Sequence, residues 1–499
     1  MKSINRRSFF KQSSLLSLSA SFGVSANPEK EAQVLIIGSG PAGLSLADKL
    51  SASGVSVVVV ESGVNRPTRQ HQLLNEVTGD LKPIEAGLGV AGRRAFGGTT
   101  HIWGGITPRF TESDFKTNTN YGYGLDWPIS FNEVSQYYCA AGAWLQNNDS
   151  LCIRGTESSL VDSSITLLNE LKRNNIKHSL PASMSVNNKG EFNAINLEKS
   201  FGFSLRSKNI TLFKNTTARR LDINKQGRVT GVYCSEFNGE EKYLNADVVV
   251  LAAGAIQNAR LLLLSKSALH PDGIGNAEGN VGGYFMDHPN TQYWLEPKKA
   301  LLSSKDDITY VHSYHYYDQM KKQGLGSALL RFGAFSARWK NNNKRRVFPE
   351  SLGYATSKQS LMIEALCEQE PISSNRLTLS MEKKDQFGDP VAHLKFKQSL
   401  KDGNTIDYIN NQLNGLAERF SVNHSIRPLR LSSHHLMGTT RMSDSDSTGV
   451  VDRNQKVFGT SNLYISGASV FSTGGAANPT LTLTALSLRL ANHLVSINK

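Results

Sequence analysis

The stretch that decides the fold reads Ala32-Gln33-Val34-Leu35-Ile36-Ile37-Gly38-Ser39-Gly40-Pro41-Ala42-Gly43. Its first six residues form the apolar run expected of a buried parallel strand, and a helical pattern follows the glycines to about Ser53. Gly38 allows the tight turn, Gly40 lets the backbone approach a pyrophosphate, and Gly43 lets helix and strand pack closely. The free N–H groups at the start of this helix would face that pyrophosphate.

A second apolar run, residues 55–60, follows the helix and ends at Glu61. Glu61 lies 23 residues after Gly38, where a carboxylate can accept hydrogen bonds from ribose hydroxyls. A GxGxxG motif alone is a weak signal, because any tight strand-to-helix turn can use such glycines. With a strand before it, a helix after it and an acid at this distance, the motif predicts a dinucleotide site. It does not distinguish FAD from a nicotinamide.

The rest of the chain favours a flavoprotein. No second GxGxxG occurs, so paired folds for two nucleotides are excluded. Strands are expected at 210–213, 228–233 and 247–251, and the last leads through Ala252-Ala253-Gly254-Ala255 into a helix at 256–264. A sheet that joins distant parts of the chain to an N-terminal Rossmann unit is typical of flavoproteins. The expected fold class is α/β, or α+β for the chain as a whole.

Length and composition exclude several other classes. The chain has 499 residues, of which 39% are hydrophobic and 19% charged, so it can bury sizeable cores and is neither disordered nor collagen-like. Mean hydropathy is −0.33, and no run reaches the roughly 18 apolar residues of a membrane span. The four cysteines form no CxxC and no cluster with histidines. We therefore expect no metal site, iron–sulfur cluster, c-type haem or redox-active dithiol.

The N-terminus has the plan of an export signal. Residues 1–26 contain four basic residues and no acid, then a mildly apolar run, then the small-residue site Val24-Ser25-Ala26. The run Asn5-Arg6-Arg7-Ser8-Phe9-Phe10-Lys11 resembles the twin-arginine motif, which directs folded proteins across a membrane. The sequence therefore predicts a bacterial periplasmic protein that takes up its cofactor before export.

The mature chain remains basic. Removal of residues 1–26 lowers the formal net charge from +13 to +9. The densest basic cluster, residues 338–346, is either a solvated loop or a docking site for an acidic electron-transfer partner, and the first is the more common role of such runs. Nucleic acid is not an expected partner in the periplasm.

An ordered series of distinctive segments continues along the chain. They read Phe96-Gly97-Gly98-Thr99-Thr100-His101-Ile102-Trp103-Gly104-Gly105; Leu251-Ala252-Ala253-Gly254-Ala255-Ile256-Gln257-Asn258-Ala259-Arg260-Leu261-Leu262; Met286-Asp287-His288-Pro289; His435-Leu436-Met437-Gly438-Thr439-Thr440-Arg441-Met442; Gly449-Val450-Val451-Asp452; Asn462-Leu463-Tyr464-Ile465-Ser466-Gly467; and Gly474-Gly475-Ala476-Ala477-Asn478-Pro479-Thr480-Leu481-Thr482. Together with residues 38–43 and Glu61, this series resembles the glucose-methanol-choline oxidoreductase family.

The resemblance implies a discontinuous Rossmann-type FAD domain and a substrate domain built on an antiparallel sheet. The FAD domain would take residues 27–120, 205–300 and 430–499, and the substrate domain residues 121–204 and 301–429. Within the latter, residues 376–380 and 391–396 fit the alternating strands of its sheet.

Oxidation of an alcohol requires the loss of a hydroxyl proton and the transfer of hydride from carbon to flavin N5. A histidine near the flavin is a suitable base, because its ordinary pKa is about 6.5. By resemblance, His435 matches the family's catalytic base and Asn478 the partner that holds the carbinol oxygen. His434 is the alternative base, although it could also be a structural histidine.

The resemblance also implies which residues bind the cofactor. These are Gly38, Ser39, Gly40, Pro41, Ala42, Gly43, Glu61, Gly97, Gly98, Thr99, Thr100, Trp103, Ala253, Gly254, Gly467, Ala468, Pro479 and Thr480. Ala468 stands where many flavoproteins carry an acid, so only its backbone is expected to take part. Relatives with covalent FAD have a histidine directly before the tryptophan of the 96–105 segment. Ile102 occupies that place and His101 comes one residue early, so noncovalent FAD is expected.

The leading functional hypothesis is a periplasmic FAD-dependent dehydrogenase that oxidises a hydroxyl of a sugar, glycoside, sugar acid or polyol. Electrons would pass to a quinone, a cytochrome c or a small partner subunit. An oxidase that uses oxygen is the first alternative, because sequence does not show the cavities that govern oxygen reactivity. A hydroxynitrile-lyase-like protein with structural FAD is the second, and a noncatalytic FAD-binding subunit is disfavoured by the presence of His435 and Asn478.

Overall fold

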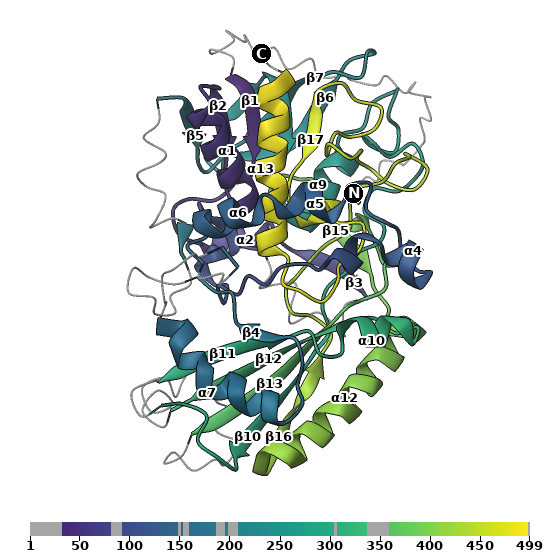
Figure 1. Ribbon diagram of the computed structural model, residues 1–499. Helices are drawn as coiled ribbons and strands as arrows, with labels where there is room; N and C mark the ends of the chain where they lie inside the picture. Colours follow the sequence, from purple (N-terminus) through teal and green to yellow (C-terminus); the bar gives the residue numbers. More distant parts are fainter. Residues whose placement is uncertain are drawn as a thin grey trace, which may run out of the picture.

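The computed structural model describes residues 32–80, 92–147, 151–152, 159–185, 195–197, 208–303, 307–336 and 359–497. The export signal in residues 1–26 and the basic cluster at 338–346 lie outside these ranges. Figure 1 shows two parts, with a parallel sheet in the upper part and a larger antiparallel sheet in the lower part.

The parallel sheet has five strands drawn from distant parts of the chain. Their order is β17 (Leu463–Ile465), β9 (Ala246–Leu251), β1 (Ala32–Ile37), β2 (Val57–Val60) and β5 (Ile210–Phe213). All neighbours are parallel, and β1 lies at the centre with Val34 opposite both Val57 and Val248. The predicted sheet around an N-terminal Rossmann unit is thus confirmed.

Two helices cover one face of this sheet. Helix α1 (Pro41–Ala52) begins with a proline in its first turn, and α13 (Thr480–Ile497) packs against it, as Figure 1 shows. Val34 and Ile36 of β1 join the leucines of both helices in one core, while Leu35 and Ile37 point into the core on the other face. Burial on both faces explains why β1 is apolar throughout.

Two glycines fix the junction between β1 and α1. Gly38 has a φ of +111°, and a Cβ there would lie 2.5 Å from the carbonyl oxygen of Ala252. A Cβ on Gly43 would lie 1.9 Å from the carbonyl oxygen of Gly38. Any larger residue at position 43 would separate helix and strand, as the sequence predicted.

The lower part is an antiparallel sheet of six strands. Their order is β16 (Ser421–Arg430), β10 (Asn290–Pro297), β13 (Ser360–Cys367), β12 (Ala328–Phe335), β11 (Ile308–Ser313) and β4 (Ser179–Pro181). Helices α7 (Ser159–Arg173) and α12 (Leu400–Phe420) pack on one face of this sheet through buried leucines. A capping box between Ser399 and Asp402 starts α12.

Two smaller sheets contain the remaining strands of the described ranges. One is antiparallel and contains β6 (Thr217–Ile223), β7 (Val229–Ser235) and β8 (Glu241–Leu244). The other has the order β14 (Arg376–Lys384), β15 (Pro390–Lys395) and β3 (Val77–Asp80). The strands expected at 376–380 and 391–396 therefore exist, but their assignment to the substrate sheet was wrong. Leu377, Ala392 and Leu394 pack in the core that lies against the nucleotide-binding sheet.

Short helices connect these elements. They are α2 (Arg69–Leu73), η1 (Gly98–His101), η2 (Glu112–Phe115), α4 (Thr117–Tyr121), α5 (Phe131–Ser135), α6 (Tyr138–Trp144), α9 (Gly254–Leu264), α10 (Tyr317–Lys322) and η5 (Ala468–Val470). A disulfide joins Cys139 of α6 to Cys152, which the sequence analysis had not anticipated. Within the described ranges, no helix has the length and apolar character needed to cross a membrane.

The fold class predicted from the sequence is confirmed: parallel nucleotide-binding and antiparallel sheets occur in one chain with helices on both. The boundaries given for the two domains stay a prediction.

Candidate active site

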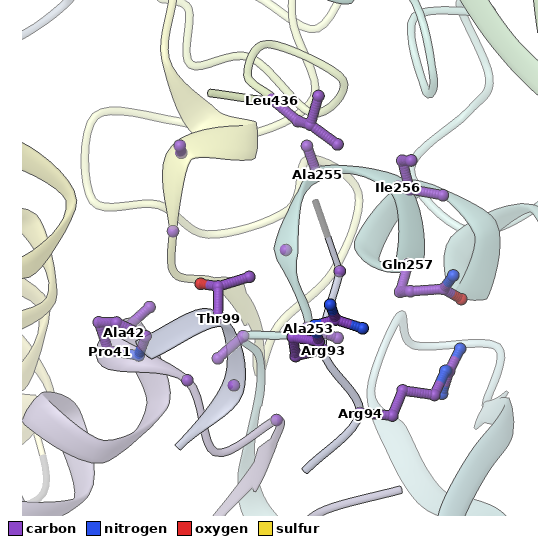
Figure 2. A pocket seen from close by; sticks show the side chains of 18 of the residues that line it. Pro41, Ala42, Arg93, Arg94, Thr99, Ala253, Ala255, Ile256, Gln257 and Leu436 are labelled. Carbon is purple, nitrogen blue, oxygen red and sulfur yellow. The ribbon is translucent and has the colours of Figure 1, made fainter. Parts of the chain in front are cut away.

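A cavity of about 410 Å³ lies where the carboxyl ends of β1 and β9 meet the first turns of α1 and α9. Figure 2 shows Pro41 and Ala42 on one side, Ile256 and Gln257 on the other, and Leu436 at the far end. Ligands of parallel sheets bind at this edge, because helix N-termini and loops converge there.

Most of the predicted site residues meet at this cavity. Its wall includes Gly38, Ser39, Gly40, Pro41, Ala42, Glu61, Gly98, Thr99, Thr100, Trp103, Ala253, Gly254, His435, Gly467, Ala468, Asn478, Pro479 and Thr480. Gly43 and Gly97 are not part of the wall. Gly43 lies between helix and strand, and the N–H of Gly97 donates to the carbonyl of Ser39 at 3.1 Å.

Glu61 is buried and bound at the end of β2. Its Oε2 accepts from the hydroxyl and the N–H of Ser39, at 2.6 and 3.1 Å, and its Oε1 accepts from the N–H of Gly63 at 2.7 Å. Burial raises the pKa of Glu61, while these bonds and the charge of Arg94 oppose the rise. The carboxylate thus connects the glycine-rich turn to the second strand.

Arg94 and Arg93 line the cavity, although neither was predicted from the sequence as a site residue. The Nε of Arg94 donates to Asn75 at 2.8 Å and its Nη1 to Ser62 at 2.9 Å. Burial, with the positive charge of Arg260 nearby, lowers the pKa of Arg94 to about 10. The only signal in the sequence was the pair of arginines shortly before the glycines of the 96–105 segment.

At the other end of the cavity, His435 lies between two side chains. Asn478 Nδ2 donates to His435 Nε2 at 2.9 Å, and His435 Nδ1 lies 2.9 Å from Nδ1 of His288. The Oδ1 of Asn478 is buried and has no hydrogen-bond partner within the described part of the chain. An acceptor left open beside an imidazole is suited to a ligand hydroxyl.

Burial lowers the pKa of His435 well below its ordinary value, and neighbouring His288, His434 and Arg331 lower it further. The imidazole is therefore neutral at pH 7. Together with Asn478, it provides a proton acceptor and a hydrogen-bonding amide on one side of the cavity.

Asp287 holds the backbone of this segment in place. Its Oδ1 accepts from the N–H groups of Ser433 and His435 at 3.0 and 2.9 Å, and its Oδ2 from the hydroxyl of Ser432 at 2.5 Å. A bridge between Met286 and Met437 aligns the two segments. Asp287 and His288 belong to one of the distinctive segments, but the sequence pattern indicated no role for either residue.

Family models match most of the segments that build this cavity. Those described as GMC oxidoreductase match residues 201–290 and 371–487, and one described as FAD binding domain matches residues 31–74. The chain belongs to the GMC oxidoreductase family. This GMC protein is an enzyme that uses FAD to oxidise CH–OH groups of alcohol or sugar-type substrates.

Several proteins align with almost the whole chain of this GMC enzyme. 2-Methyl-1,2-propanediol dehydrogenase of Mycolicibacterium austroafricanum is 26% identical, over 93% of this chain and 95% of that protein. The fructose dehydrogenase large subunit of Gluconobacter japonicus is 22% identical, over 94% and 99%. Among solved structures, formate oxidase of Aspergillus oryzae RIB40 superposes with a TM-score of 0.64 at 16% identity, over 95% and 99%, which shows a shared fold.

The cavity of the GMC enzyme fits FAD. Apart from the adjoining backbone, no atom lies within 4 Å of a Cβ built on Gly40 or on Gly254, so both backbones border open space. A Cβ on Gly98 would approach the Cα of Gly40 to 3.0 Å, so the two glycine segments are in close contact. The pyrophosphate would lie at the start of α1 beside Gly40, the ribose near Glu61, and the flavin ring toward His435.

Two other histidines of the GMC enzyme differ from His435 in their exposure or in their position relative to the cavity. His434 lines the cavity but is exposed and has a φ of +65°. His101 Nε2 lies 2.9 Å from the carbonyl oxygen of Phe96, and His101 is not part of the cavity wall. The roles given to His435 and Asn478 stay predictions, although the structure brings the two side chains together.

Proposed function

We propose that the protein is a periplasmic dehydrogenase that oxidises a hydroxyl of a sugar, glycoside, sugar acid or polyol, with His435 as the base. The observation that carries the proposal is the contact between Nε2 of His435 and Asn478 at the end of the FAD cavity. The lowered pKa of His435 keeps its imidazole ready to accept a proton.

Each side chain has a defined task. His435 Nε2 takes the proton of the substrate hydroxyl, and the amide of Asn478 holds the carbinol oxygen in line with it. FAD, when bound, would supply the acceptor for the hydride of the same carbon. Asp287 keeps the base in place through the backbone of residues 433 and 435.

A polar row on the six-stranded sheet supports a substrate with several hydroxyls. Gln292 lies opposite Glu364, Glu364 opposite Arg331, and Arg331 opposite His312. Arg331 and Glu364 form an ion pair, and the Nε of Arg331 has no hydrogen-bond partner in the described part of the chain. A row of donors and acceptors suits a polyhydroxylated molecule better than a simple aliphatic alcohol.

This row lies on the face of the sheet that is turned toward the base. Asn290 is on the same face of β10 as Gln292, because strand residues alternate, and its Nδ2 donates to the hydroxyl of Ser433 at 2.7 Å. The positive charge of Arg331 is one of the causes that lower the pKa of His435. The opposite face of the sheet packs on α7 and α12.

The relatives support the same substrate class but divide on the electron acceptor. Two are named for dehydrogenases of a diol and of fructose, and others for oxidases of paromamine and of C-glycosides. We favour a dehydrogenase that passes electrons to a quinone, a cytochrome c or a partner subunit. The predicted twin-arginine signal supports the periplasmic location, and so does the Cys139–Cys152 disulfide, because such bonds persist in oxidising compartments.

Noncovalent FAD is part of the proposal. His101 bonds a backbone carbonyl outside the cavity wall, and Ile102 takes the wall position before Trp103. Acid precipitation of the purified protein should therefore release the flavin into the supernatant, and flavin that stays with the pellet would contradict this part.

The main experiment is anaerobic reduction of the flavin by a panel of sugars, polyols, 1,2-diols and aliphatic alcohols. Polyhydroxylated substrates should bleach the flavin with a kcat/KM about tenfold or more above aliphatic alcohols of equal length, because each lost hydrogen bond costs about 1 kcal/mol. The Arg331→Gln variant should reduce this preference, with Arg376→Gln, in the separate sheet of β14, as the control. Fast peroxide formation without added acceptor would show that the protein is an oxidase and not a dehydrogenase.

A further inference from the structure

The buried histidine behind the base has no role in the proposed reaction so far. His288 is fully buried, and its Nδ1 lies 2.9 Å from Nδ1 of His435, with the two rings at 76° to each other. The residues are 147 positions apart in the chain. A close contact between two nitrogens that can each donate or accept requires one proton between them.

The surroundings of His288 decide which ring holds that proton. The carbonyls of Gly474 and Gly475 favour a proton on His288, although its Nε2 forms no hydrogen bond of regular geometry among the described residues. A neutral His288 with its proton on Nε2 can only accept at Nδ1. His435 must then carry its proton on Nδ1, which leaves its Nε2 unprotonated where Asn478 donates.

We propose that His288 sets the tautomer of His435 and takes up the Nδ1 proton of His435 when the substrate hydroxyl is deprotonated. His288 is thus a positioning residue and a proton relay behind the base. This inference rests on the proposed function of His435.

The transfer balances in protons and charge. The substrate O–H bond breaks and an N–H bond forms at Nε2 of His435, while the Nδ1–H proton of His435 moves to Nδ1 of His288. His435 ends neutral, with its proton on Nε2, and His288 ends as a cation with both nitrogens protonated. The positive charge has moved away from the cavity by the width of one ring.

The charges around His288 suit this end state. Burial lowers the pKa of His288, while the carboxylates of Asp287 and Glu368 and the carbonyls of Gly474 and Gly475 raise it. Around His435 the basic neighbours are His288, His434 and Arg331, and a positive charge on any of them disfavours a cation there. A proton shared by the pair is therefore more stable on His288 than on His435.

Two variants separate the two roles. In His288→Asn, Oδ1 of the new side chain can still accept from Nδ1 of His435 but cannot hold a proton, whereas His288→Ala can do neither. We expect the rate of anaerobic flavin reduction to fall about tenfold in the first and about 100-fold in the second, with KM little changed. His393→Asn is the matched control, because His393 bonds Thr78 in a different sheet.

The pH profile gives a second readout. In the native pair the first proton taken up at low pH is more stable on His288, so loss of His288 leaves only the lower pKa of His435 itself, and the acid limb of kcat/KM should move to lower pH in both variants. A merely structural role would lower the rate without moving that limb.

A readout independent of turnover is the ¹⁵N NMR spectrum of histidine-labelled holoprotein. His435, assigned by comparison with His435→Ala, should show a protonated Nδ1 and an unprotonated Nε2. A protonated Nε2 in the resting protein, or native rate and pH profile in His288→Ala, would overturn the inference. Loss of activity in His435→Ala with an unaffected His288→Ala would leave the proposed function intact and reject only the relay.

Discussion

The ammonium group of Lys321 lies 3.0 Å from Oδ1 of Asp114, and neither side chain is exposed to solvent. Lys321 belongs to α10 and Asp114 to η2, so the pair joins two segments far apart in the chain. Tyr317 Oη donates to the same carboxylate at 3.1 Å and accepts from the N–H of Ala476 at 2.9 Å. The ionic cluster therefore also fixes the loop that carries Asn478.

Replacement of Lys321 by methionine should destabilise the protein strongly. The volume is similar, but Asp114 and Glu368 would lose their buried cation, for which the expected cost is about 3–5 kcal/mol. Although burial lowers the pKa of Lys321, the two carboxylates raise it overall, so the amine is charged at neutral pH. Denaturant unfolding measures the change, with exposed Lys322→Met as the control. Equal stability of the two variants would contradict the account.

The Glu61→Gln variant should bind FAD about 10–100-fold more weakly. A glutamine would point an NH₂ group at one of the donors on Ser39 and Gly63, and charge-assisted bonds contribute about 1.5–3 kcal/mol each. Fluorescence titration of the apoprotein with FAD measures the affinity, and exposed Glu76→Gln is the control. Native FAD affinity in Glu61→Gln would show that the turn does not depend on the carboxylate.

Thiol counting tests the disulfide. Cys234 and Cys367 are free and buried, and Cys139 is bonded to Cys152. Protein exported to an oxidising compartment should therefore show no reactive thiol when folded, two when unfolded, and four after reduction. Removal of the bond by Cys139→Ser should lower the free energy of unfolding by roughly 3 kcal/mol. The disulfide joins residues 13 positions apart, and a loop of about that size restricts the unfolded chain by roughly this amount. Four thiols in the unfolded, unreduced protein would exclude the bond.

The sequence predicted local elements well. One short segment contains strand β1, the turn at Gly38 and helix α1 in direct succession. Its apolar run, glycines and helical pattern were therefore enough to predict all three elements. Strand β9 was also found, because a continuous apolar run identifies a buried strand wherever it occurs, and β5 was found although none of its four residues is fully buried.

Long-range pairing was not predictable in the same way. Periodicity located β14 and β15, but not the parallel partner of β15, which is β3 more than 300 residues away. The contact of His288 with His435 was not predictable for a similar reason, since long-range contacts such as the bridge between Met286 and Met437 bring the two residues together. Residue patterns indicate that a strand or a histidine is buried, but they do not indicate which distant residue or strand it contacts.

The His435→Ala variant should keep its flavin and lose its reduction. The side chain lies at the end of the cavity, away from Glu61 and the glycine turn, so bound FAD should remain at native stoichiometry. Removal of a general base lowers the rate about 10²–10⁴-fold, which stopped-flow absorbance under anaerobic conditions measures. His434→Ala is the comparison, because the sequence left that residue as the alternative base. A larger loss in His434→Ala would exchange the two assignments.

The pH dependence of kcat/KM follows from the sign of one pKa shift. His435 acts as a base only when neutral, and burial together with its positive neighbours lowers its pKa well below 6.5. The rate should therefore stay level as pH falls from 8 to 6.5 and decline only at lower pH, where the imidazole gains a proton. An unperturbed base would already have lost half of its rate near pH 6.5. Such a midpoint, measured with a substrate that does not titrate, would show that His435 is solvated or is not the base.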